Sequence, residues 1–142
     1  MMNTPKIRKK PTGDVKPRRI LIVDDEPDFR EMLNLMLRKE GFETAIAENG
    51  EDFLNTIDDF QPDLVTLDVI MPGLTTEEIL KKLSKKKCKP KIILLTVVRY
   101  SKETLEEILK KDNIVACINK PFDLDDFMKS VNELLQINKF KR

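Results

Sequence analysis

The chain contains no histidine and no tryptophan, and only two of its 142 residues are cysteines. Histidine is the usual general base, proton shuttle and metal ligand near neutral pH. Its absence excludes Ser-His-Asp triads, histidine-dependent zinc sites and phosphohistidine carriers in this chain. The two cysteines, Cys88 in a lysine-rich stretch and Cys117 in an apolar run, form no pattern typical of a disulfide framework or a zinc site.

Long hydrophobic runs are also absent. No apolar stretch approaches the roughly 18 to 20 residues that would span a bilayer, and the N-terminus lacks the apolar core of a secretory signal. We therefore expect a soluble, cytoplasmic protein with no membrane span. A chain of 142 residues is long enough for one domain that buries a hydrophobic core without disulfides or a structural metal.

The net charge of +1 is unevenly distributed. Residues 1–19 hold seven of the 26 basic residues and one of the 25 acidic ones, so they carry +6 and the remaining chain carries −5. Three prolines and few apolar residues in this segment predict a flexible basic N-terminal arm over residues 1–18 and one folded domain over 19–142. We interpret the arm as a solvated extension. Binding of a membrane surface, nucleic acid or an acidic partner stays an alternative.

Four short, largely apolar runs each end on a polar side chain. The runs are 20–23, ending at Asp24 and Asp25; 65–67, ending at Asp68; 92–95, ending at Thr96; and 115–118, ending at Asn119 and Lys120. Such runs, alternating with helical patterns, are typical of buried parallel strands. With a fifth strand over 44–47, they predict an α/β fold with a flavodoxin-like, doubly wound five-stranded parallel sheet, strand order 2-1-3-4-5, and five helices.

The polar groups at the strand ends should converge, because the carboxyl ends of parallel strands share one edge of the sheet. Three carboxylates in one site repel one another, and a divalent cation such as Mg²⁺ relieves that repulsion. A lysine and a hydroxyl would then supply a charge and a hydrogen-bond donor to a phosphoryl group. These residues, Asp24, Asp25, Asp68, Thr96 and Lys120, predict phosphate chemistry at an aspartate. Asp68, the lone acid that ends the central strand, is the candidate phosphoacceptor.

Four motifs of this chain resemble those of a known family, the receiver domain of two-component response regulators. They are Val23-Asp24-Asp25-Glu26-Pro27, the stretch from Leu67 to Gly73, Leu95-Thr96, and Asn119-Lys120-Pro121-Phe122. The resemblance runs from Arg19 to about Ile137. It implies a switch in a phosphorelay: a sensor histidine kinase or phosphotransfer protein phosphorylates Asp68 with Mg²⁺, and binding to a downstream output protein or domain changes. Such a protein is not an enzyme beyond catalysing its own phosphorylation and dephosphorylation.

The resemblance also assigns the metal ligands. Asp25 is expected to bind Mg²⁺ directly, Asp24 to act through water, and Asp68 and the backbone carbonyl of Ile70 to complete the shell.

Two further residues receive roles from the resemblance. Lys120 is expected to pair with Asp68 at rest and with a phosphoryl oxygen afterwards, and the Lys120-Pro121 bond is expected to be cis. Thr96 is expected to donate its hydroxyl to the phosphoryl group and to move inward as it does so. The face formed by the fourth helix, fifth strand and fifth helix is expected to pass this change to a partner.

The sequence departs from the family pattern at several positions. Cys117 stands where a switching Tyr or Phe is usual, Thr75-Thr76 replace an Asp-Gly pair, and Val97 is bulkier than the usual small residue. We expect a different turn at Thr76, because threonine lacks the freedom of glycine at positive φ. Val97 is expected to narrow the entrance to the site.

The two positions that commonly steer the hydrolytic water are Ile70 and Val98, both apolar. We therefore predict slow self-dephosphorylation, on a scale of hours rather than seconds.

Three alternatives remain. Cys117 and Val97 favour a receiver-like protein-interaction module that works without phosphorylation. A phosphohydrolase of the haloacid dehalogenase type would need an Asp-x-Asp motif and a cap domain, whereas this chain has Asp24-Asp25 and no second core. Nucleic-acid binding is not expected except through the basic arm, and would depend strongly on salt. The chain is interpreted as either a stand-alone regulator or a receiver from a longer protein.

Overall fold

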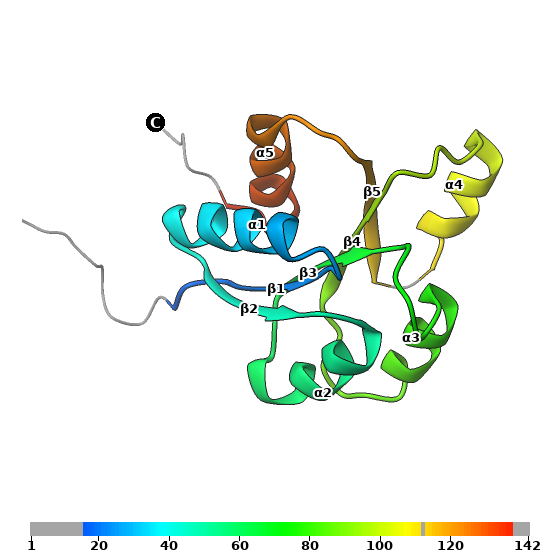
Figure 1. Cartoon of the computed structure of the whole chain (residues 1–142), viewed down its shortest axis with the longest axis horizontal. Helices are drawn as coiled ribbons and strands as arrows, with labels where there is room; N and C mark the ends of the chain where they lie inside the picture. The colour runs from blue at the N-terminus through cyan, green and yellow to red at the C-terminus, as the bar shows by residue number, and fades with distance from the viewer. Residues whose placement is uncertain (1–15, 112, 138–142) are drawn as a thin grey trace, which may run out of the picture.

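The structure, a computed structural model, describes residues 16–111 and 113–137. Within these residues, strands and helices alternate strictly along the chain (Figure 1). The elements are β1 (Arg19–Val23), α1 (Pro27–Lys39), β2 (Glu43–Ala47), α2 (Gly50–Phe60), β3 (Leu64–Asp68), α3 (Thr76–Leu83), β4 (Lys91–Thr96), α4 (Lys102–Leu109), β5 (Ile114–Asn119) and α5 (Leu124–Leu134). Most of the predicted basic arm, residues 1–15, lies outside the described part, so its flexibility stays a prediction.

The five strands form one parallel sheet in the order β2-β1-β3-β4-β5, which confirms the predicted topology. Alternate strand residues point to opposite faces of the sheet. Leu21 and Val23 pack with residues of α2 and α3, whereas Ile20 and Ile22 pack with residues of α1 and α5. The sheet is therefore covered on both faces, as Figure 1 shows.

Side-chain caps set the helix starts. Ser101 caps α4 and Asp123 caps α5: each accepts a hydrogen bond from a backbone N–H three residues later. Thr75 caps α3 and forms a reciprocal capping box with Glu78. In the turn before α3, positive φ occurs at Gly73 (φ 94) and not at a threonine.

Three large apolar side chains on the helices are exposed. Met32 on α1, Leu109 on α4 and Leu124 at the start of α5 are 37%, 45% and 40% exposed. Each lies at the margin of its apolar stripe, and a helix that covers a sheet buries only the centre of that stripe. The apolar periodicity of these helices therefore indicates a helix but overstates how many of its apolar side chains are buried.

Candidate functional site

The acidic residues meet at the carboxyl edge of the sheet. Asp24 follows β1 and Asp68 ends β3, and both are buried, at 1% and 8% exposed. Together with the exposed Asp25, each offers a carboxylate oxygen, and these three oxygens lie within 4.8 Å of one another. The predicted convergence of the three acids is confirmed.

Backbone and side-chain contacts hold Asp24 in place. Its N–H donates to the Ala47 carbonyl at 3.1 Å, and its Oδ1 accepts from the Glu26 N–H at 2.9 Å. Its carbonyl accepts from Arg30 Nη1 at 2.6 Å. Because the loop after β1 is tied at both backbone atoms of Asp24, this carboxylate is a fixed part of the site.

Lys120 enters the site from the loop after β5. Its Nζ donates to Asp24 Oδ2 at 2.9 Å and lies 3.7 Å from Asp68 Oδ2. The pairing expected with Asp68 is present as the longer of two contacts, and the shorter one joins Lys120 to Asp24. The Lys120-Pro121 bond is cis, as predicted.

The pKa of Asp68 is raised above its ordinary value of 3.8. Burial is the largest cause, followed by repulsion from Asp24, with a smaller contribution from Asp25. The Lys120 ammonium and the Ile70 N–H, which donates to Asp68 Oδ1 at 3.2 Å, act in the opposite direction. Asp68 is therefore a carboxylate whose negative charge the surrounding protein compensates incompletely.

Thr96 ends β4 and is fully buried. Its Oγ1 accepts a hydrogen bond from the Val98 N–H at 2.9 Å, and its carbonyl accepts from the Lys120 N–H at 2.8 Å. Asn119 Nδ2 donates to the carbonyls of Val98 at 2.6 Å and Thr96 at 3.2 Å. The loop after β4 is thereby tied to the loop that carries Lys120.

Sequence reasoning missed Tyr100, the single tyrosine of the chain. Burial and the neighbouring Cys117 raise the pKa of its hydroxyl, and a side-chain hydrogen bond with Thr96 lowers it. Tyr100 thus reaches Thr96 from the loop between β4 and α4, close to Cys117, where the family usually has an aromatic ring. The available signal was a lone tyrosine four residues after Thr96.

The donor set fits a hard divalent cation. It consists of carboxylate oxygens, with no sulfur and no imidazole, and one of the three acids is exposed to solvent. Mg²⁺ prefers such oxygen ligands and keeps several waters. A cavity of about 450 Å³, lined in part by Asp25, Glu48 and Gly73, opens beside these acids.

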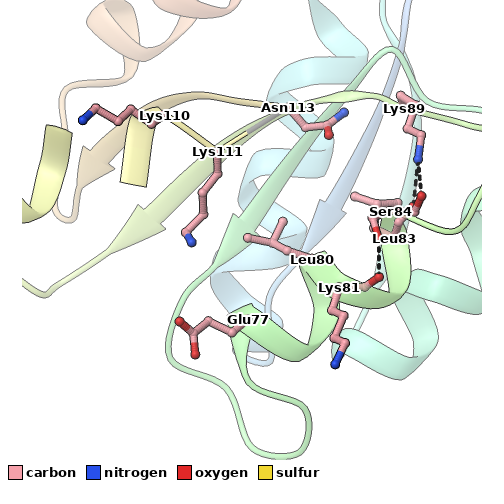
Figure 2. Close-up of a pocket in the computed structure, with 9 residues that line it drawn as sticks. All are labelled: Glu77, Leu80, Lys81, Leu83, Ser84, Lys89, Lys110, Lys111 and Asn113. Carbon is pink, nitrogen blue, oxygen red and sulfur yellow. Dashed lines mark hydrogen bonds between the residues drawn. The ribbon is translucent and has the colours of Figure 1, made fainter. Parts of the chain in front are cut away.

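A larger cavity lies elsewhere (Figure 2). It has a volume of about 850 Å³ and is lined by Glu77, Leu80, Lys81, Leu83, Ser84, Lys89, Lys110, Lys111 and Asn113. These residues belong to α3 and to the loops that enter β4 and β5, at the edge of the sheet opposite the acids. Lys89 Nζ caps the end of α3 by donating to the Ser84 carbonyl at 2.6 Å, and Figure 2 shows the lysine ammonium groups spread apart. None of the three acids lines this cavity, so the acidic site is separate from it.

Comparison with known proteins gives one consistent family. A family model described as the response regulator receiver domain matches residues 20–132. The regulatory protein AtoC of Escherichia coli is 38% identical over 125 residues, which cover 87% of this chain and 26% of that protein. Sporulation initiation phosphotransferase F of Bacillus subtilis is 34% identical over 119 residues, which cover 84% of this chain and 94% of that protein.

A solved structure has a similar fold. The response regulator protein TrrA of Thermotoga maritima, crystallised with Mg²⁺-BeF, is 38% identical with a TM-score of 0.69, covering 82% of this chain and 98% of that one. TrrA has also been crystallised with the histidine kinase ThkA. The chain spans about a quarter of AtoC and about half of the DNA-binding response regulator MtrA, both of which are longer proteins. No helix among residues 16–111 and 113–137 is long and apolar enough to cross a membrane.

Proposed function

The chain belongs to the response regulator receiver domain family, whose members act as phosphoacceptor switches, and from that premise we propose that Asp68 is the residue that accepts the phosphoryl group. The observation that carries the proposal is the convergence of Asp24, Asp25 and Asp68 within 4.8 Å, with Lys120 bridging two of them. Asp68 ends the central strand and is the acid whose pKa the protein raises.

We propose that Asp24, Asp25, Asp68 and the backbone carbonyl of Ile70 hold Mg²⁺. When bound, the ion would neutralise the acids and polarise the oxygens of the incoming phosphoryl group. Support comes from the all-oxygen donor set and from the Mg²⁺-BeF complex of TrrA. The site also has the incompletely compensated negative charge that a cation would relieve.

The side chains of the chain have separate tasks in this proposal. Asp68 attacks phosphorus with one carboxylate oxygen, and the leaving group departs on the opposite side, so positioning and charge compensation account for most of the rate. Lys120 moves its ammonium from Asp24 toward a phosphoryl oxygen, a short shift because it already lies 3.7 Å from Asp68. No proton has to be taken from Asp68, because the ionised form is the nucleophile.

Thr96 would report the new charge. Its Oγ1 already accepts from the Val98 N–H, so its own O–H is the donor that can turn either to Tyr100 or to a phosphoryl oxygen. Phosphorylation would draw this donor toward Asp68 and release Tyr100. The added charge would therefore alter the loop between β4 and α4 first.

The phosphodonor is proposed to be a sensor histidine kinase or a phosphotransfer protein. Two observations support this: the chain has no histidine of its own, and the similar TrrA forms a complex with the histidine kinase ThkA. An output protein or domain would bind the altered surface, and the longer relatives AtoC and MtrA are consistent with such a domain. The chain would catalyse only its own phosphorylation and dephosphorylation.

Intact mass spectrometry after incubation with acetyl phosphate and Mg²⁺ tests the proposal. Wild type should gain the mass of one phosphoryl group, and Asp68→Asn should gain none. Asp59→Asn is the matched control, because Asp59 is an exposed acid at the carboxyl end of α2. The next residue, Phe60, contacts Arg19 at the start of β1, so this end of α2 lies at the opposite ends of the strands from the site. If wild type and Asp59→Asn are both folded and neither gains mass, phosphorylation is refuted. That result would favour the phosphorylation-independent interaction module.

A further inference from the structure

The ammonium of Lys120 contacts an aromatic ring as well as the two acids. Its Nζ lies 4.1 Å from the centroid of the Phe29 ring, on the first turn of α1. A cation over the face of an aromatic ring at this distance is attracted by the negative face of the ring. The Lys120 side chain is only 17% exposed, so water screens this contact incompletely.

The ring of Phe29 packs against further aromatic rings. Phe122 meets it edge to face, with centroids 6.0 Å apart and planes at 80°. Phe122 in turn stacks on Phe127 at 4.9 Å, and Phe127 is a fully buried residue of α5. Three rings from α1, the loop after β5 and α5 thus connect the ammonium to the hydrophobic core.

The start of α1 adds a second restraint. The N–H of Phe29 donates to Glu26 Oε1 at 2.7 Å, and Pro27 occupies the first turn. The backbone of Phe29 is therefore capped and its side chain is packed. An uncharged ring in a fixed position can hold a lysine without competing with the acids for a divalent cation.

That property matters when the acids bind a cation. The closest partner of Lys120 is Asp24, at 2.9 Å, and a divalent ion at Asp24 would both share that charge and repel the ammonium. The ring carries no net charge, so its attraction to Lys120 survives. We propose that Phe29 is a positioning residue for phosphoryl transfer: its ring face keeps the Lys120 ammonium beside Asp68 once Asp24 and Asp25 are engaged by Mg²⁺. This inference rests on the proposed role of Asp68.

The contact can be measured without any reaction. The protons on Cε of Lys120 should show an upfield ring-current shift in the NMR spectrum, with and without Mg²⁺. Phe29→Leu should abolish the shift, and Phe29→Tyr should keep it. Disappearance of the shift from the wild-type spectrum when Mg²⁺ is added would overturn the inference. It would mean that Lys120 leaves the Phe29 ring in the Mg²⁺-bound protein.

The effect on phosphorylation is measured as the rate constant with acetyl phosphate and saturating Mg²⁺. Phe29→Leu should lower it about 2- to 30-fold, the range that corresponds to the strength of one such contact. Phe29→Tyr should stay within about twofold of wild type. Phe60→Leu is the matched control, because Phe60 makes the same kind of contact with Arg19 at 5.5 Å, at the other edge of the sheet. It should leave the rate unchanged.

Packing and charge attraction are separated by fluorinated phenylalanines at position 29. Each fluorine withdraws electron density from the ring face and changes its shape little, so the rate should fall steadily with the number of fluorines. A rate independent of fluorination, or an unaltered rate in Phe29→Leu, would refute the positioning role while leaving Asp68 as phosphoacceptor. Absence of phosphorylation in wild type would refute the proposed function instead, and the NMR measurement would still decide whether the contact exists.

Discussion

Two helices of similar sequence character, α2 and α4, are packed very differently. α2 buries Phe53, Leu54 and Ile57, whereas no residue of α4 is buried. The strands they accompany differ in the same way: all five residues of β3 are buried, but of the six in β5 only Ile114 is. α4 stands at the β5 edge of the sheet in Figure 1.

We call the densely packed region around α2, β1 and β3 the firm part of the molecule, and the less buried region around α4 and β5 the compliant part. Asp24 and Asp68 are carried by β1 and β3, where displacement would disrupt a buried core. Lys120 follows β5, and the loop after Thr96 leads into α4; displacement of these segments disrupts less buried surface. Regions with few buried apolar contacts open at lower free energy. A change at the site should therefore propagate toward α4 and β5 rather than toward α2.

The most direct test of this difference in packing is to truncate one apolar residue on each helix. Phe53→Ala should lower the free energy of unfolding by about 3 to 5 kcal/mol, because it empties a fully buried site. Leu109→Ala on α4, where the side chain is 45% exposed, should cost less than about 1 kcal/mol. Urea denaturation measures both, and similar losses would contradict the division.

A second change tests what keeps the compliant part in place. Asn119→Ala removes the two hydrogen bonds to the carbonyls of Val98 and Thr96, and should cost about 1 to 3 kcal/mol. Hydrogen exchange should accelerate in α4 and leave α2 unaltered. Asn55→Ala, at an exposed position of α2, is the control and should change neither helix. Faster exchange in α2 would show that the two parts are coupled.

The lifetime of the phosphorylated state tests the role of two apolar residues next to the site. Ile70 and Val98 offer no polar group to a hydrolytic water, so the acyl phosphate should decay over hours rather than seconds. Val98→Asn should accelerate decay roughly tenfold, equivalent to about 1.4 kcal/mol in the barrier. Phosphoprotein decay followed by intact mass measures this, with Leu35→Asn on the exposed side of α1 as control. A wild-type lifetime of seconds would contradict the prediction.

The smallest effect concerns the charge of Asp68 in the firm part. Its folded-state pKa is raised, so the folded protein binds this proton more tightly than the unfolded chain does. Stability is then lost as the pH rises from the unfolded-state value of 3.8 through the raised value, the reverse of the usual behaviour of a carboxylate.

Asp68→Asn should therefore be more stable than wild type at neutral pH without divalent cations, and this advantage should disappear at acidic pH. Lys120 and the Ile70 N–H offset part of the effect, which keeps it small. Thermal unfolding of both proteins across that pH range measures it. An advantage of wild type that grows with rising pH would contradict the sign.

Much of the fold was predictable from local patterns. The order of elements and the convergence of Asp24, Asp25 and Asp68 are confirmed, because apolar runs and strand ends are local signals. The burial of individual helix residues follows less directly from the sequence. Leu109 fits the apolar stripe of α4, yet its exposure depends on how much of the edge strand that helix covers.

The order of apolar runs and helical patterns is enough to predict a doubly wound α/β domain whose acids, Thr96 and Lys120 share one edge, because the carboxyl ends of parallel strands all lie at the same edge of the sheet. Only the tertiary structure decided that Lys120 lies closer to Asp24 than to Asp68, over the ring of Phe29, and that Tyr100 reaches Thr96. Those contacts join side chains from separate loops and helices. Their distances depend on how the layers pack, which residue spacing does not encode.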